Sequence, residues 1–371
     1  MPDATPAVRA RLAEACLELL RIPSVTGQEA ELSKHLRRWA TSLKQLSRDD
    51  VMRHEHALIL GQPDDERPCV ALVGHLDTVP GHTTDPTPYQ SNDRIVGLGA
   101  SDMKGGLAVM QVLFETLDLG KLPFALMLVL YDREEGPYRD NGLQALLERF
   151  DVLGAIDLAI CMEPTDNTLQ VGCMGSLHAR VTFKGQAAHS ARPWQGENAI
   201  HKAGPLLSQL LHQKPRETLV DGLVFREAVS VTLARGGLSA NTVPAELELN
   251  VNHRFAPTLP IAAAVDRAIN EVKQLAAGAE VEIRDIAPPG PLPQGNPIVD
   301  HLRTLAHLSV EPKQAWTDVA RLAAHGIDAV NFGPGATSQA HQRGEWVSHA
   351  ALVSSYEILS QVLSVPLEGT V

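Results

Sequence analysis

The chain has 371 residues, 44% of them hydrophobic, and this length favours two globular domains with sizeable cores. Its 32 basic and 44 acidic residues give a formal charge of −12. The sequence has no basic run that could neutralise a phosphate backbone or an anionic membrane, so nucleic acids and membranes are not expected partners.

The N-terminal segment and the cysteines favour a cytoplasmic location. Residues 7–21 mix charged and apolar side chains at helical spacing, without the apolar core or cleavage site of a signal peptide. No stretch is long and apolar enough to span a bilayer. The four cysteines are scattered without a CxxC pair, which is typical of reduced core thiols: Cys16, Cys69, Cys161 and Cys173.

The first part of the chain alternates between helix and strand patterns. Its short apolar strands lack period-2 alternation, as is typical of strands that are covered on both faces. In chain order the predicted elements are helices at 7–20 and 28–43, a strand at 68–74, a helix at 105–117, and strands at 124–131 and 157–162. This order predicts an α/β layered domain.

After Cys173 the pattern changes to half-exposed strands. The predicted elements are a strand at 177–183, a helix at 197–211, strands at 229–235 and 245–253, a helix at 261–276 and a strand at 280–286. The order β-α-β-β-α-β is the ferredoxin-like arrangement, so we expect a small inserted domain at this point.

A turn-rich segment at 288–293 precedes a return to the α/β pattern. The predicted elements are a helix at 298–308, a short strand before Trp316, a strand at 329–332 and a last helix from His349. We therefore expect a discontinuous first domain with the insert as a lid. The predicted boundaries are 1–174 and 287–371 for the first domain and 175–286 for the lid.

Two polar residues, His75 and Asp77, follow the strand at 68–74. They project to the same side at the carboxyl end of a buried strand, where α/β proteins place ligands. His75 could bind a metal, with Asp77 accepting its second ring N–H. An ordinary hydrogen-bonded pair is the commoner arrangement, so the pair alone leaves both interpretations open.

The glycine-rich segment 97–106 leads into a helix and carries an acid, Asp102. A dinucleotide-binding loop is the competing interpretation, but the third glycine of GxGxxG would fall on Asp102, and no GK[ST] follows. A carboxylate at this position would repel a pyrophosphate. It would suit divalent cations, and its two oxygens could bridge two of them.

Further acids follow the next two predicted strands. Glu134 and Glu135 come after the strand at 124–131, and Glu163 comes after the strand at 157–162. Clustered acids are unfavourable unless cations compensate their repulsion, although a solvated turn would also explain the Glu134–Glu135 pair alone. With His341, in a loop beyond another strand, the set has two histidines and several carboxylates, which suits Zn²⁺.

Taken together, these motifs resemble the M20 family of metallopeptidases and deacylases. The matching segments follow the family's order and spacing: 75–77, 100–106, 134–136, 162–164, 188–190 and 340–341. The resemblance implies a zinc-aminopeptidase-like α/β catalytic domain, an inserted ferredoxin-like α+β lid and dimerisation domain, and hydrolysis of amide bonds.

The resemblance also implies two Zn²⁺ ions per subunit, for which Co²⁺ or Mn²⁺ can substitute. His75, Asp102 and Glu163 would hold one ion, and Asp102, Glu135 and His341 would hold the other, with Asp102 as the bridge. Glu134 would be the general base that takes a proton from the attacking water. Asp77 would support this catalytic group.

In the lid, the resemblance assigns His189 to the stabilisation of the oxyanion, often in the active site of the partner subunit, which implies a homodimer formed through the lid. Asn241 and Arg254 match positions that bind the polar and carboxylate ends of an N-acyl amino acid, and a guanidinium suits a carboxylate. Thr317 matches a further substrate-binding position.

Within the family, four segments resemble a branch that removes succinate from an N-succinylated diamino acid on the route to lysine: 185–204, 215–217, 316–321 and 331–335. Met174 and Thr337 stand where longer proteobacterial members of this branch have an Arg and an Asn that help to hold the succinyl carboxylate. The motif at 339–342 also resembles N-acetylornithine deacetylases, so deacetylases, and family dipeptidases or carboxypeptidases, are the alternatives.

Other classes fit less well. A dinucleotide-dependent oxidoreductase would need the third glycine of GxGxxG, which this sequence lacks. A serine hydrolase would need a GxSxG motif, which the sequence also lacks. A non-catalytic binding member of the fold would be favoured by the loss of a ligand or of the base, yet every one of these residues is present.

Overall fold

The computed structural model describes residues 4–367. The chain divides into two units. The first contains the described residues up to Val171, together with Pro293–Glu311 and the residues from Thr317 onward, and the second contains Gly172–Leu292 and Pro312–Trp316. The long segment of the second unit begins three residues before and ends six residues after the predicted lid of 175–286, and Pro312–Trp316 lies within the range predicted for the first domain.

An eight-stranded mixed sheet forms the centre of the first unit, in the order β1-β2-β6-β3-β7-β17-β8-β16. The strands are β1 (Val51–His54), β2 (Ala57–Leu60), β3 (Cys69–His75), β6 (Ala125–Tyr131), β7 (Leu158–Cys161), β8 (Leu169–Val171), β16 (Val310–Pro312) and β17 (Ala329–Asn331). Every residue of β3 and β6 is buried, which explains why these strands are apolar without alternation. Burial of each Val or Leu side chain contributes about 1.5–3 kcal/mol to the free energy of unfolding.

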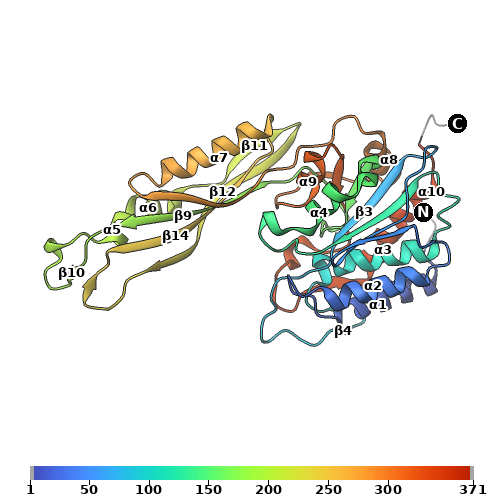
Figure 1. Cartoon of the computed structure of the whole chain (residues 1–371), viewed down its shortest axis with the longest axis horizontal. Helices are drawn as coiled ribbons and strands as arrows, with labels where there is room; N and C mark the ends of the chain where they lie inside the picture. The colour runs from blue at the N-terminus through green and yellow to red at the C-terminus, as the bar shows by residue number, and fades with distance from the viewer. Residues whose placement is uncertain (1–3, 368–371) are drawn as a thin grey trace. The chain divides into compact units, whose positions relative to one another are not determined.

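Helices cover both faces of this sheet. In Figure 1, α1, α2 and α3 lie on one side of it, and α4 and α9 lie on the other. The α-helices of the first unit are α1 (Pro6–Leu20), α2 (Ala30–Ser42), α3 (Gly105–Thr116), α4 (Gly142–Arg149), α8 (Pro297–Leu305), α9 (Val319–Ala324) and α10 (His349–Ser364). A small sheet of β4 (Tyr89–Gln90), β5 (Arg94–Val96) and β18 (Trp346–Ser348) completes the unit.

The second unit is built on a five-stranded antiparallel sheet in the order β11-β12-β14-β9-β15. Its elements are β9 (Gly175–Lys184), α5 (Ala199–Lys202), α6 (Gly204–His212), β11 (Arg216–Val220), β12 (Leu223–Gly236), β14 (Glu246–Phe255), α7 (Ile261–Leu275) and β15 (Glu280–Ala287), with a short ladder between β10 (Ala188–His189) and β13 (Thr242–Val243). The inward residues of β14 alternate with polar ones, and the helices pack on that inward face.

The predicted ferredoxin-like order is present, but the sheet has one more strand than predicted. β11 forms a hairpin with β12 across Asp221 and Gly222, both of which have positive φ. An Asp-Gly pair between two strands is a strong hairpin signal, so the sequence did contain the information.

The predicted helix at 197–211 is wrong as a single element. The structure has two helices, α5 and α6, with Ala203 between them. Pro205 lies in the first turn of α6, where its missing N–H is tolerated, whereas inside one continuous helix it would remove a hydrogen bond and clash with the preceding turn.

The prediction that the cysteines are core thiols agrees with the structure. All four cysteines are buried and reduced, and burial raises the pKa of Cys16 and of Cys69 to about 12. Within residues 4–367, no helix combines the length and hydrophobicity needed to cross a bilayer.

A buried carboxylate, Glu227, connects several elements of the second unit. Glu227 is 3% exposed and accepts hydrogen bonds from the Arg267 guanidinium (2.9 Å) and the Ala256 N–H (2.8 Å), and Arg216 forms an ion pair with it. Burial alone raises the pKa of Glu227, but the hydrogen bonds from Arg267, Ala256 and Arg216 outweigh it and hold the pKa below its ordinary value of 4.5.

We expect Glu227→Gln to lower the free energy of unfolding by about 1–3 kcal/mol at neutral pH, because the arginines lose a charged partner. A carboxyl with a depressed folded pKa stabilises the fold above its unfolded pKa, and this contribution disappears as the pH falls through the folded pKa. Urea unfolding should therefore show a difference in the free energy of unfolding between the wild-type chain and Glu227→Gln, and this difference should shrink below pH 4.5.

The exposed carboxylate Glu217 provides the control, because its ion pair with Arg226 lies on the surface of the same hairpin. Glu217→Gln should change the free energy of unfolding by less than about 1 kcal/mol. Equal losses in the two variants, or a difference that does not depend on pH, would contradict the assignment.

Candidate metal centre

Four adjacent parallel strands bring polar side chains to one edge of the large sheet. β6, β3, β7 and β17 are neighbours, and their ladders are parallel. β3 ends at His75, Glu134 and Glu135 follow β6, Glu163 follows β7, and His341 lies in the loop beyond β17. The carboxyl ends of parallel strands meet at the same edge, so this arrangement follows from the topology.

Asp102 reaches the same place from the segment that precedes α3. The turn before it contains Gly99, whose φ of 83° suits glycine. One Asp102 oxygen, Oδ1, lies 3.2 Å from Nε2 of His75, and the other, Oδ2, lies 3.6 Å from Nε2 of His341. The two oxygens of this carboxylate thus face different histidines.

The side chains form two overlapping clusters that share Asp102. His75, Asp102 and Glu163 bring ligand atoms within 4.8 Å of one another, and so do Asp102, Glu135 and His341. The tetrahedral ligands of one zinc ion, each about 2.1 Å from the metal, lie about 3.4 Å from one another. The spacing and donor types therefore fit a pair of divalent cations that share one carboxylate.

The electrostatics of the histidines support the same interpretation. The hydrogen bond to Glu135, with Nε2 and Oε1 2.8 Å apart, raises the pKa of His341 to about 9. Burial lowers the pKa of His75, but its contacts with Asp102 and Asp77 raise it well above 6.5 overall. Carboxylates that hold a proton on a histidine in this way can hold a cation in its place, because metal binding and protonation compete.

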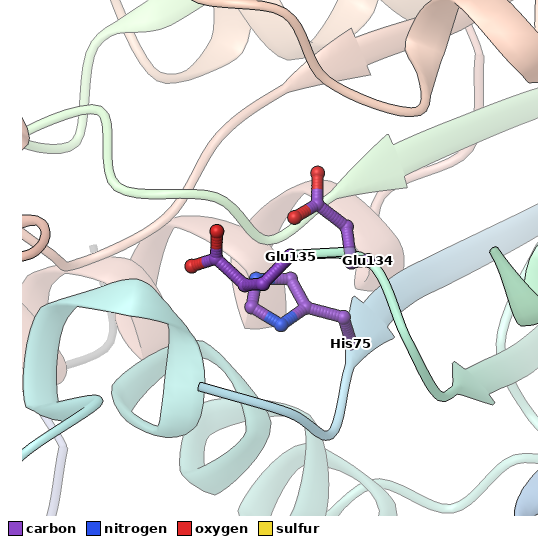
Figure 2. Close-up of side chains that lie close together, drawn as sticks. All are labelled: His75, Glu134 and Glu135. Atoms are coloured by element: carbon purple, nitrogen blue, oxygen red, sulfur yellow. The ribbon is translucent and has the colours of Figure 1, made fainter. Parts of the chain in front are cut away.

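Glu134 lies next to these clusters. Figure 2 shows His75 at the end of its strand and the side chains of Glu134 and Glu135 on the neighbouring loop. The three can bring ligand atoms within 4.8 Å of one another. Burial raises the pKa of Glu134 well above 4.5, and the carboxylates of Glu135 and Glu163 raise it further. Such a concentration of acids is stabilised by bound cations.

Asp77 has different partners from those predicted. Nδ1 of His75 lies 3.0 Å from the backbone oxygen of Asp77 and 3.6 Å from its carboxylate. The buried carboxylate instead accepts hydrogen bonds from the N–H of Glu134 (2.9 Å), the N–H of Glu135 (3.0 Å) and the Thr26 hydroxyl (2.9 Å). These donors occupy both oxygens, so Asp77 chiefly holds the loop that carries the two glutamates.

Two charged residues beside the site were not identified from the sequence. Lys104 is 2% exposed, and its Nζ donates to the backbone oxygens of Leu19 (3.2 Å) and Ile22 (2.8 Å), so it connects the end of α1 to the Asp102 segment. Burial lowers the pKa of Lys104 to about 8. Glu345 is also 2% exposed and accepts hydrogen bonds from the segment that carries Asp102. Only the proximity of Glu345 to His341 in sequence hinted at this.

The predicted substrate-binding residues lie in both units. Thr317 belongs to the first unit and is buried. His189, Asn241 and Arg254 belong to the second unit, where His189 is exposed and its Nδ1 accepts a hydrogen bond from the N–H of Ala191 (3.0 Å). Their contribution to the chemistry stays a prediction from the family resemblance.

Comparison with known proteins supports the same assignment. Residues 71–365 match the model of peptidase family M20/M25/M40. The chain is 34% identical over 351 residues to the succinyl-diaminopimelate desuccinylase of Corynebacterium glutamicum, covering 93% of this chain and 94% of the relative. It is 36% identical over 352 residues to a Mycobacterium tuberculosis protein provisionally named for the same activity, DapE, covering 94% and 97%.

Solved structures share the fold at lower sequence identity. A metallo-carboxypeptidase from Sulfolobus solfataricus has a TM-score of 0.75 at 16% identity, covering 95% of this chain and 98% of that one. Bacillus subtilis YXEP, a dinuclear metal binding peptidase from the M20 family, has a TM-score of 0.67 at 18% identity, covering 98% and 99%. The predicted fold class is confirmed, and this chain belongs to peptidase family M20/M25/M40.

Proposed function

We propose that this protein is a succinyl-diaminopimelate desuccinylase, which hydrolyses N-succinyl-LL-2,6-diaminopimelate to succinate and LL-2,6-diaminopimelate in cytoplasmic lysine synthesis. As a member of its family, the chain is a metal-dependent hydrolase of amide bonds. The observation that carries the proposal is the pair of three-residue clusters that share Asp102. The names of the two relatives at 34% and 36% identity support the choice of acyl group.

The residues present fit two Zn²⁺ ions, with Co²⁺ or Mn²⁺ as substitutes. His75, Asp102 and Glu163 would hold one ion, and Asp102, Glu135 and His341 would hold the other. When bound, the ions would polarise the amide carbonyl and lower the pKa of the attacking water.

Glu134 is the proposed general base. Its carboxylate lies beside the ligand set without being needed to complete either cluster that contains Asp102. Because burial raises its pKa, Glu134 binds a proton more readily than an exposed glutamate does. This suits a group that takes a proton from the attacking water and returns it to the leaving amine. The Asp77 carboxylate holds the backbone of Glu134 in place by accepting a hydrogen bond from its N–H.

The second unit would contribute the substrate contacts. We assign His189 to the oxyanion, by donation from Nε2, because Nδ1 already accepts the Ala191 N–H. Arg254 would bind a substrate carboxylate, while Asn241 and Thr317 would bind other polar groups of this small N-acyl amino acid. The family resemblance supports a homodimer through the second unit, with His189 acting in the partner's site.

Two positions favour a second candidate function, the deacetylation of N-acetylornithine. Met174 is fully buried and packs with Phe225 and Ala256. Its thioether has no N–H donor and no charge, so it cannot bind a succinyl carboxylate as the arginine of longer desuccinylases would. The Thr337 side chain is also engaged, because its hydroxyl lies 3.4 Å from both the backbone oxygen of Pro164 and the carboxylate of Asp166.

Turnover of a substrate panel tests the proposal. We expect the zinc-loaded protein to release amine from N-succinyl-LL-diaminopimelate with a kcat/KM about 10- to 100-fold above that for N-acetylornithine or a dipeptide, because only the first offers an acyl carboxylate. Chelation should abolish turnover, and added zinc should restore it. Preference for N-acetylornithine would support the second candidate, and no turnover of any member would contradict both.

A further inference from the structure

Glu345 binds the backbone beside Asp102 through both of its carboxylate oxygens. Oε2 accepts a hydrogen bond from the N–H of Gly99 (2.7 Å), and Oε1 accepts from the N–H groups of Ser101 (2.7 Å) and Asp102 (2.8 Å). With an exposure of 2%, the side chain is shielded from water. Three backbone N–H groups thus converge on this one carboxyl group, each at 2.7–2.8 Å.

Other contacts join the same two segments. The N–H of Gly97 donates to the backbone oxygen of Glu345 (2.8 Å), and the Ser101 hydroxyl donates to the backbone oxygen of Trp346 (2.8 Å). Trp346 begins β18, which pairs with β5 immediately before the Gly97 turn. The segment that carries Asp102 is therefore bonded to the segment that follows His341 at four positions: Gly97, Gly99, Ser101 and Asp102.

Glu345 itself takes no part in either ligand cluster. The clusters that contain Asp102 are completed by other residues, and the Glu345 oxygens are directed at backbone N–H groups. A carboxylate engaged in this way is not available as a ligand or as a base. Its hydrogen bonds reach the site through the backbone of Asp102, whose side chain lies only 3.2 Å from His75.

We propose that Glu345 is a positioning residue for the metal centre: it holds Asp102 in its bridging place and joins it to the loop of His341. The inference rests on the proposed function in that it takes Asp102 and His341 as metal ligands. It adds that these two ligands are set by one buried carboxylate, so both cation positions depend on it. Residues that orient ligands in this way typically change metal affinity by about 10- to 100-fold when replaced.

The test is the zinc affinity of Glu345→Gln, measured on the metal-stripped full-length chain by competition with a chromophoric chelator. Glutamine keeps the size of the side chain, but its NH₂ group would replace one oxygen. A backbone N–H that has an acceptor in the wild-type chain would then face another donor. We expect zinc affinity to fall by about 10- to 100-fold, with both positions affected. Glu345→Asp, which keeps the carboxyl group on a shorter side chain, should give a smaller loss.

Glu115→Gln is the matched control. Glu115 lies at the opposite end of α3 from Asp102 and accepts hydrogen bonds from Trp39 Nε1 (2.8 Å) and the Arg11 guanidinium (2.9 Å). Glu115 is a glutamate with a structural role, and its side chain is 20% exposed. Its replacement should lower the thermal stability of the metal-free chain without changing zinc affinity, so the comparison separates positioning from general destabilisation.

The outcomes separate this inference from the proposed function. Wild-type zinc affinity in Glu345→Gln would overturn it, as would an equal loss in the Glu115→Gln control. If Glu345→Gln does not fold, wild-type zinc affinity in Glu345→Asp would overturn it instead. A wild-type chain that binds zinc but hydrolyses no substrate would contradict only the proposed function, because zinc affinity is measured without substrate.

Discussion

Glu134→Gln should lower kcat by about 10²- to 10⁴-fold, the usual contribution of a positioned general base. Glutamine keeps the shape of the side chain but cannot take a proton from water. The zinc content should not change, because neither cluster that contains Asp102 includes Glu134 and the Asp77 carboxylate still holds the loop backbone. The measurement is kcat together with zinc content by atomic absorption.

The pH profile provides an independent reading of the same variant. A general base acts in its deprotonated form, so kcat/KM should rise with pH through the pKa of Glu134, which burial shifts upward. The acidic limb should therefore disappear in Glu134→Gln. Glu148→Gln is a suitable control, because Glu148 is an exposed carboxylate on α4 that bonds to Gln144. Undiminished kcat in Glu134→Gln would exclude this residue as the base.

The arrangement of the site was predictable because it depends on strand order more than on side-chain detail. Buried apolar strands are recognisable in a sequence, and polar residues just beyond them in parallel strands must meet at one edge. The structure brings together the residues predicted to bind metal, although their roles stay predictions: His75, Asp102, Glu135, Glu163 and His341. The same reasoning located Glu134 beside them.

The supporting contacts were not predictable, because they join distant parts of the chain without a local pattern. Glu345 accepts hydrogen bonds from residues 243 to 246 positions earlier, and Asp77 binds backbone N–H groups more than 50 positions later. Backbone donors carry no residue identity. A sequence can therefore indicate that Asp77 is close to His75, but it does not reveal that its carboxylate accepts hydrogen bonds from the loop of Glu134.

Asp102→Asn should remove zinc from both positions. Each oxygen of Asp102 faces a different histidine, so both clusters depend on this side chain. Asparagine keeps one carbonyl oxygen and loses the negative charge. Its NH₂ group would face one of the cations, and this group cannot act as a ligand. We expect zinc affinity to fall by more than about 100-fold and hydrolysis to be undetectable.

His341→Ala is the informative comparison, because His341 belongs to only one of the two Asp102 clusters. Its side chain is 50% exposed, whereas that of His75 is 1% exposed, so the position that contains His341 should also exchange metal more readily. His341→Ala should keep one zinc ion per chain at concentrations where Asp102→Asn keeps none. Zinc stoichiometry after equilibrium dialysis checks this. One retained ion in Asp102→Asn would show that the carboxylate serves a single cation, and the two positions would then have to be treated as independent sites.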